Sequence, residues 1–141
     1  MKLIVPDASV LLKWVLPGER EPHVTEALEI RDAFVAGKIR LLVPALWFFE
    51  VGNMLGLYHP TTAEERLSAL VDASIPEAAL DREWQSVTLN LVNKHRVTFY
   101  DASYHALAIV NRGVFVTADA KYQRKFGSDS AVRILPDWKT S

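Results

Sequence analysis

The chain contains no cysteine, no long apolar run and no excess charge of either sign. Without cysteine it has no disulfide framework, no thiolate zinc site and no cysteine nucleophile. Its 16 lysines and arginines nearly balance its 17 aspartates and glutamates, for a formal net charge of −1. This balance excludes the strongly positive field of a general nucleic-acid binder, so any such contact must come from a local patch.

The apolar runs are too short for a membrane or for export. A membrane-spanning helix needs roughly 18 apolar residues and a signal peptide roughly 7–15, but only three apolar residues separate Lys2 from Pro6. We therefore expect a cytoplasmic protein without membrane contact. With 50% hydrophobic and 23% charged residues in 141 positions, the chain is predicted to fold as one domain, residues 1–141.

Short buried strands alternate with longer helices. Apolar runs predict strands at 3–5, 40–43, 114–117 and 132–135, and a weaker one at 74–79. Helical patterns cover 23–36, 45–57, 82–95 and 100–111, and two more helices are expected from Ser9 as N-cap to residue 16 and after Thr61 or Thr62. This alternation predicts an α/β fold with a central parallel sheet and helices on both faces.

Four of the acidic residues lie in unusual places. Asp7 and Asp119 follow strands, so both are expected at the carboxyl edge of the sheet, where α/β proteins bind ligands. Glu50 lies inside the apolar stretch WFFEVGNML, and Asp101 opens the apolar stretch DASYHALAIV. An ionised carboxylate in apolar surroundings is costly unless it is paired or bound to a cation.

Two simpler explanations stay open at this point. Asp7, Asp101 and Asp119 could each cap the helix that follows, because aspartate accepts hydrogen bonds from the first backbone N–H groups. Glu50, in mid-helix, could form a salt bridge with a lysine or arginine.

Together, however, four such carboxylates would repel one another unless a cation lay among them. Carboxylate oxygens without histidine or cysteine favour Mg²⁺ or Mn²⁺ over zinc. The four acids therefore predict a site for a hard divalent metal.

Polar neighbours support that interpretation. Asn53 lies three residues after Glu50 and Tyr104 three after Asp101, which places each on the same helix face as its acid. Ser9 and Thr117 bring hydroxyl groups beside Asp7 and Asp119, where they could orient the ligands. Ser9 as a plain helix cap and Asn53 as a plain surface residue remain alternatives.

At these positions the sequence resembles the PIN domain, and more narrowly the VapC-type toxins of toxin–antitoxin pairs. The resemblance rests on VPDASVLLKW, on E-x-x-N at Glu50 and Asn53, on YDASYHALA, and on T-x-D at Thr117 and Asp119. The motifs are weak one by one, but their order and spacing extend from Asp7 to Asp119.

The resemblance implies a three-layer α/β/α sandwich and an endoribonuclease that depends on Mg²⁺ or Mn²⁺. It implies an acidic quartet of Asp7, Glu50, Asp101 and Asp119, as catalytic residues and metal ligands, supported by Ser9, Asn53 and Thr117. It also implies a homodimer and an antitoxin that covers the active site. Some relatives carry another acid two positions after the last aspartate, where this chain has Lys121, which leaves a second metal in doubt.

On this basis we hypothesise that a metal-activated water cleaves RNA and leaves a 5′ phosphate and a 3′ hydroxyl. The basic stretch KYQRK could hold phosphates with Lys121, Arg124 and Lys125, while Tyr122 stacks on a base. Lys13 is a further candidate for phosphate binding. As a bare charge run, KYQRK is otherwise a solvated helix face.

Other interpretations remain. A phosphoacceptor signalling domain also carries aspartates and Mg²⁺ at strand ends, although it would need paired acids after the first strand. A non-catalytic PIN-like interaction module would keep the fold alone, and cleavage of DNA rather than RNA stays open. The aromatic cluster Trp47, Phe48 and Phe49 is expected in the core or at an interface, and we expect no catalytic role for His105.

Overall fold

The alternating pattern produces a parallel sheet covered by helices on both faces. A computed structural model describes residues 1–16, 18, 21–129 and 131–139. In it, four strands pair in the order β2-β1-β3-β4, all in parallel: β1 (Lys2–Pro6), β2 (Ile39–Leu41), β3 (Val114–Thr117) and β4 (Val132–Ile134). The helices are α1 (Ala8–Leu12), α2 (Val24–Val35), α3 (Leu46–Tyr58), α4 (Ala63–Asp72), α5 (Arg82–His95), α6 (Phe99–Val110) and α7 (Ala120–Phe126), with a 3₁₀ turn η1 (Leu135–Asp137).

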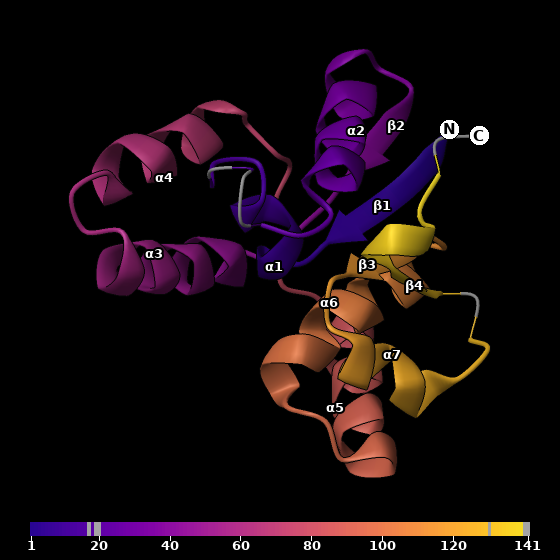
Figure 1. The fold of residues 1–141 in the computed structure, drawn as a ribbon. Helices are drawn as coiled ribbons and strands as arrows, with labels where there is room; N and C mark the ends of the chain where they lie inside the picture. The colour runs from indigo at the N-terminus through magenta and orange to yellow at the C-terminus, as the bar shows by residue number, and fades with distance from the viewer. Residues whose placement is uncertain (17, 19–20, 130, 140–141) are drawn as a thin grey trace.

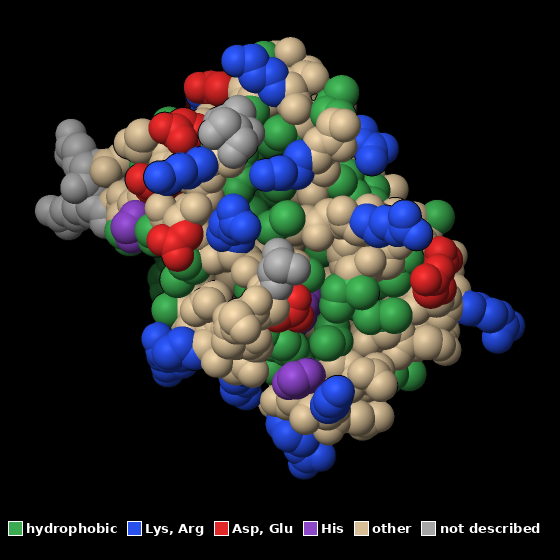
Figure 2. Space-filling model, turned by 90° about the vertical axis from the view of Figure 1, so that its right-hand side faces the viewer, with side chains coloured by type: hydrophobic (Ala, Val, Ile, Leu, Met, Phe, Trp, Pro, Cys, Tyr) green, Lys and Arg blue, Asp and Glu red, His purple; other side chains and the backbone are tan. Residues whose placement is uncertain are grey.

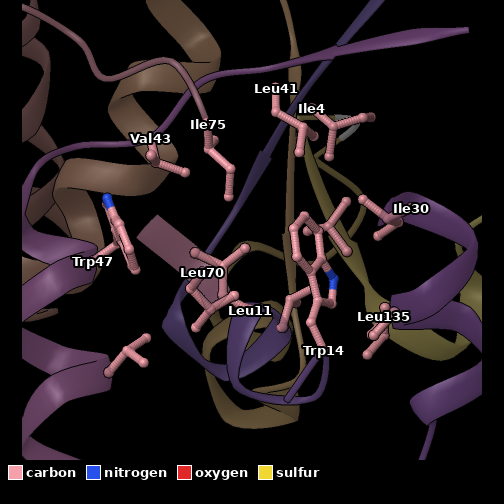
Figure 3. Packing of buried hydrophobic residues seen from close by; sticks show 14 of the residues in the cluster. Ile4, Leu11, Trp14, Ile30, Leu41, Val43, Trp47, Leu70, Ile75 and Leu135 are labelled. Atoms are coloured by element: carbon pink, nitrogen blue, oxygen red, sulfur yellow. The ribbon is translucent and has the colours of Figure 1, made fainter. Parts of the chain in front are cut away.

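Alternate residues of the central strands point to opposite faces of the sheet and begin two separate cores. Ile4 and Val116 belong to a cluster with residues of α1, α2, α3 and α4, and Figure 3 shows Trp14 near the centre of this cluster. Val5 and Phe115 belong to a second cluster with residues of α5, α6 and α7. Figure 1 shows α3 and α4 extending together to one side of the sheet. The predicted α/β/α sandwich with a central parallel sheet is therefore confirmed.

The boundaries of most elements agree with the sequence patterns to within one or two residues. The first helix differs, because Asp7 rather than Ser9 caps it and it ends at Leu12. Thr62 precedes α4, but its side chain forms no capping bond. Residues 74–79 form no strand and contribute a single bridge, from Glu77 to Val43.

The aromatic cluster of α3 divides between core and surface. Trp47 is buried, and its indole Nε1–H donates to Glu77 Oε2 at 2.7 Å. Phe48 and Phe49 are exposed, at 41% and 68%, so the expectation of a core position is wrong for these two. None of the described helices has the length and apolar character needed to cross a membrane.

The approach of β1 to the start of β3 depends on a glycine. A Cβ atom added to Gly113 would lie 2.6 Å from the carbonyl oxygen of Leu3 and 3.2 Å from its Cβ. Because the first of these neighbours is backbone in a paired strand, it cannot rotate away. Gly113 therefore permits the pairing that places the ends of β1 and β3 side by side.

We expect Gly113→Ala to destabilise the protein by about 1–3 kcal/mol, the usual cost of forcing an atom into a packed region. Gly56→Ala is the matched control, because Gly56 lies within α3 and an added Cβ would meet nothing within 4 Å. In a helix the control should be neutral or stabilising by up to about 1 kcal/mol. Urea unfolding measures both, and equal effects of the two changes would contradict the argument.

Candidate active site

The register of β1 and β3 brings Asp7 to Thr117. Pro6 is paired with Val116, and the backbone N–H of Asp7 donates to the carbonyl of Val116 at 3.2 Å. The next residue of each strand therefore lies at the same edge. Figure 1 places α1, the start of α3 and α6 around this edge.

The Asp7 carboxylate accepts three hydrogen bonds. The hydroxyl of Ser9 donates to Oδ1 at 2.5 Å, the hydroxyl of Thr117 donates to Oδ2 at 2.6 Å, and the N–H of Val10 donates to Oδ1 at 3.3 Å. The bond from Val10 makes Asp7 the N-cap of α1, as the capping explanation in the sequence analysis allowed. Both hydroxyls also accept: Ser9 from the N–H of Ala118 at 3.1 Å, and Thr117 from that of Asp119 at 3.0 Å.

Burial raises the pKa of Asp7 from its ordinary 3.8 to about 6. The bonds from Ser9 and Thr117 act in the opposite direction, and the negative charge of Asp101 adds to the increase. Hydrogen bonding therefore offsets only part of the cost of removing this carboxylate from water.

The carboxylate of Glu50 accepts a hydrogen bond from a tyrosine, and no lysine or arginine among the described residues pairs with it. The hydroxyl of Tyr104 donates to Glu50 Oε1 at 2.6 Å, which joins α6 to α3. Burial raises the pKa of Glu50, the Tyr104 bond lowers it, and repulsion from Asp101 raises it further. Burial and the same carboxylate hold the pKa of Tyr104 far above its ordinary value, so its hydroxyl keeps its proton and remains a donor.

Asp101 lies in the first turn of α6 and is not its cap. The cap is Thr98, whose side chain accepts from the N–H of Asp101 at 3.1 Å. Burial raises the pKa of Asp101, the bond with Thr98 lowers it, and the charge of Asp119 raises it. Asp101 in turn raises the pKa of both Asp7 and Glu50, so its negative charge acts on two of the other acids.

Asp119 is the cap of α7. Its Oδ1 accepts from the N–H groups of Lys121 at 2.9 Å and Tyr122 at 3.2 Å. Its Oδ2 makes no hydrogen bond with another described residue. The capping explanation therefore holds for Asp119 and accounts for one of its two oxygens.

The four acids share one environment but do not converge on one point. No group of three or more His, Asp or Glu side chains within the described part of the chain is arranged so that it could hold a metal ion. None of the four forms a salt bridge there with lysine or arginine, so the salt bridge left open as an alternative for Glu50 is not found among the described residues. Asn53 is exposed on α3, one turn from Glu50, and makes no hydrogen bond to a described residue.

The candidate phosphate-binding residues have different environments. Lys13 is only 5% exposed, and its ammonium donates to Glu21 Oε1 at 2.6 Å and to the carbonyl of Pro22 at 2.8 Å. Its charge is already paired inside the fold, which argues against Lys13 as a candidate for phosphate binding. Lys121 and Arg124 are exposed on α7.

Lys125 is also exposed, and its ammonium donates to the carbonyl of Arg96 at 3.3 Å. Figure 2 shows the face that includes α7, on which lysine and arginine side chains are spread among acidic and apolar ones. They do not form a single basic patch on that face.

Tyr122 cannot stack on a base, because it is 4% exposed and packs on Phe115 and Phe126. Its hydroxyl lies 2.9 Å from Nδ1 of His105, and Nε2 of that ring lies 3.5 Å from Asp129 Oδ2. Burial lowers the pKa of His105 to about 4 despite the nearby Asp129. His105 is a neutral core residue in the cluster beneath α7.

Two features of the site escaped the sequence analysis. Thr98 caps α6, although the spacing T-x-x-D from Thr98 to Asp101 is a recognisable start signal for a helix. The bond from Tyr104 to Glu50 joins residues 54 positions apart. No local pattern could have indicated it.

Comparison with known families decides how the fold is classified. The PIN domain family matches residues 4–127. The chain belongs to the PIN domain family. The resemblance inferred from the sequence motifs is thereby confirmed, and PIN domains are generally nucleases.

Solved structures share the PIN fold. The crystal structure of PAE2754 from Pyrobaculum aerophilum is 20% identical, with a TM-score of 0.65 over 96% of this chain and 92% of that one. A toxin–antitoxin complex from Klebsiella pneumoniae contains a chain 16% identical, with a TM-score of 0.64 over 96% of this chain and 98% of that one. No curated protein matches the sequence.

The raised pKa of Asp7 has a consequence for stability. Between about pH 4 and pH 6 the unfolded chain releases this proton while the folded PIN domain retains it, so stability falls as pH rises through that window. In chelator at pH 7, Asp7→Asn should therefore raise the free energy of unfolding by up to about 3 kcal/mol, and should change little near pH 3.5.

The matched control is Asp72→Asn, which changes an exposed acid at the end of α4. Urea titrations across this pH range measure both variants. A destabilised Asp7→Asn protein at pH 7 would show that the hydroxyl bonds outweigh the cost of burial.

Proposed function

We propose that this PIN domain is an endoribonuclease that depends on Mg²⁺ or Mn²⁺. The observation that carries the proposal is the group of carboxylates around Asp101, which repel one another and have no lysine or arginine partner in the described part of the chain. Their oxygen atoms suit a hard divalent ion.

The donor set fits magnesium although no three acids converge. Mg²⁺ keeps several waters and is commonly bound through one or two carboxylates together with substrate phosphate. Asp7 and Asp101 would hold the ion, and Glu50 and Asp119 would complete the acidic quartet around it. When bound, the ion supplies a water of lowered pKa and neutralises charge on the phosphoryl oxygens.

Hydrogen bonds within the protein orient the carboxylates that would bind the metal. Ser9 and Thr117 direct their hydroxyl protons at the two oxygens of Asp7, which fixes the plane of its carboxylate. The hydroxyl of Tyr104 donates to one carboxylate oxygen of Glu50 and leaves the second oxygen for the metal. Asp119 is held by its cap to α7 through one oxygen.

Hydrolysis would add water to the phosphorus and break its bond to the 3′ oxygen. The products are then a 5′ phosphate and a 3′ hydroxyl. Exposed Lys121, Arg124 and Lys125 would contact phosphates beyond the acids, and Asn53 would support Glu50 from the exposed face of α3. A 2′,3′-cyclic phosphate among the products would contradict the hydrolytic reaction.

We further propose that the protein is a toxin controlled by an antitoxin and forms a homodimer. Support comes from the likeness to a chain of a toxin–antitoxin complex. A groove of about 370 Å³ also lies beside Ser9, and its lining includes Leu12, Met54 and Tyr58 as well as the paired Lys13 and Glu21. A partner in this groove would cover the approach to Asp7. The exposed Phe48 and Phe49 offer apolar area for a second copy.

The competing interpretations are separated by one assay. The PIN family match favours a nuclease over a phosphoacceptor domain, whose paired acids are missing after β1. A non-catalytic module would bind metal without cleaving any nucleic acid. Single-stranded RNA and DNA of the same sequence, tested in parallel, reveal which is the substrate.

Asp101→Asn should reduce metal-dependent RNA cleavage by about 100-fold or more. The metal supplies several kcal/mol of stabilisation in the transition state, and each 1.36 kcal/mol is tenfold in rate. Cleavage of end-labelled RNA is measured with Mg²⁺, with Mn²⁺ and with chelator. Asp72→Asn, at the exposed end of α4, is the matched control and should cleave as the wild type does. Equal activity of both variants would remove Asp101 from the site.

Replacing Lys121, Arg124 and Lys125 by glutamine should weaken RNA binding and reduce its salt dependence. Each phosphate contact with a single strand contributes about 0.7 to the slope of log K against log salt concentration, so three contacts contribute about 2. Binding is measured by fluorescence anisotropy in chelator, where no cleavage is expected.

The control for this prediction removes the same number of charges at the opposite end of the sheet. In this control variant, three exposed residues at the start of β1 and β2 are replaced by glutamine: Lys2, Lys38 and Arg40. If both triple variants reduced the slope of log K against log salt concentration equally, the basic residues of α7 would contribute only through the total charge of the protein and not through direct phosphate contacts.

A further inference from the structure

A cavity of about 710 Å³ opens between the start of α3, the start of α5 and the start of α6. Its volume is within the range of roughly 300–1,000 Å³ of small-molecule sites. Apolar side chains make up most of its lining, including Leu46, Leu80 and Trp84. Neither the acidic quartet nor the basic residues of α7 contribute to it.

The cavity lies immediately beside the acids. Leu46 in its wall is one turn before Glu50 on the same face of α3, and Tyr100 is one turn before Tyr104 on α6. The hydrogen bond from Tyr104 to Glu50 therefore joins these two helices one turn beyond the cavity wall. A chain bound across the acids would pass the mouth of the cavity.

Aromatic rings are available at the mouth. Phe99 and Tyr100 line the cavity and directly precede Asp101, and they are 48% and 61% exposed. Exposed aromatic rings beside a nucleic-acid site form stacking surfaces for unpaired bases. The indole of Trp84, 9% exposed, lies in the wall.

Most polar groups of the lining already have partners within the protein. Trp84 Nε1–H donates to the carbonyl of Ser103, Thr88 donates to that of Trp84, and Ser103 donates to that of Tyr100. Asp81 accepts from the N–H of Trp84 as the cap of α5.

Gln85 and Arg82 are different, because neither side chain makes a hydrogen bond or salt bridge to another described residue. The amide of Gln85 both donates and accepts, and the guanidinium of Arg82 only donates. Together with the hydroxyl of Tyr100, which also has no hydrogen-bond partner among the described residues, these groups remain available to recognise a ligand.

The charge of the lining argues against a phosphate as the ligand. Arg82 is balanced by Asp81, and no other charged residue faces the cavity. The environment suits a planar, uncharged group with a polar edge. We propose that the cavity binds an unpaired base of a nucleotide close to the scissile phosphate, and that it contributes to the sequence preference of cleavage. This inference rests on the proposed nuclease function.

The test combines a protein change with a substrate change. Tyr100→Ala removes a stacking ring, and a series of single-stranded RNAs of equal length carries one abasic ribose at each position in turn. Affinity is measured by fluorescence anisotropy in chelator. We expect Tyr100→Ala to weaken binding of the intact RNA by about 5- to 100-fold, the range given by one base stacked on an aromatic ring.

At one position of the series, the abasic ribose should weaken wild-type binding by a similar factor and should not weaken binding of Tyr100→Ala any further. Ala78→Leu, which fills the cavity from the segment before α5, should give the same pattern without removing an aromatic ring. Leu89→Ala is the control, because Leu89 is 44% exposed on α5 but does not line the cavity. In this control, the abasic ribose should weaken RNA binding by the same factor as in the wild type.

The remaining outcomes overturn the inference in distinguishable ways. Suppose the wild type cleaves RNA with metal, but the loss of affinity caused by Tyr100→Ala and the loss caused by the abasic ribose are additive at every position. The base then does not occupy the cavity, and the nuclease proposal stands. If Tyr100→Ala changes only the sedimentation coefficient, a second copy of the chain covers the cavity. If the wild type neither binds nor cleaves RNA, the nuclease proposal and this inference both fail.

Discussion

The pairing of β1 with β3 is the constraint on which the site depends. These strands are far apart in the sequence, and their parallel register sets Pro6 beside Val116 and so brings the following residues to one edge. The close approach at the other end of the pair requires Gly113, where any side chain would meet the backbone of Leu3. A slip of one residue in this register would turn Thr117 away from Asp7, because successive side chains of a strand point to opposite faces.

The same edge explains how the fold tolerates a buried carboxylate. The hydroxyls of Ser9 and Thr117 each accept a backbone N–H, so the proton of each is directed to Asp7. Such donors favour the ionised carboxylate, but burial and the charge of Asp101 still keep the pKa of Asp7 raised. The site therefore holds its first acid in a fixed plane without fully stabilising its charge. That balance suits the cation binding proposed for this site, and it lowers the stability of the protein at neutral pH when no cation is bound.

Much of the fold could be predicted, because it depends on local patterns, and local patterns also singled out the four acids as candidates. Short apolar runs gave the strands, and Asp7 and Asp119 stood out because each follows one. The errors arose where a side chain's surroundings come from distant or irregular segments. From the sequence, Lys13 was a candidate for phosphate binding. In the structure, the segment after α1 places Glu21 beside its ammonium group, which donates to the Glu21 carboxylate. Tyr122 lies within a polar run, yet the aromatic cluster around Phe115 buries it.

Helix α6 connects the site, the cavity and the core, and its period explains how one helix can do so. Asp101 and Tyr104 lie on the side of the acids, Phe99 and Ser103 line the cavity, and Leu107 packs into the core under the sheet. Because these groups share one rigid helix, a ligand that moved α6 from the cavity side would also move Asp101 relative to Asp7.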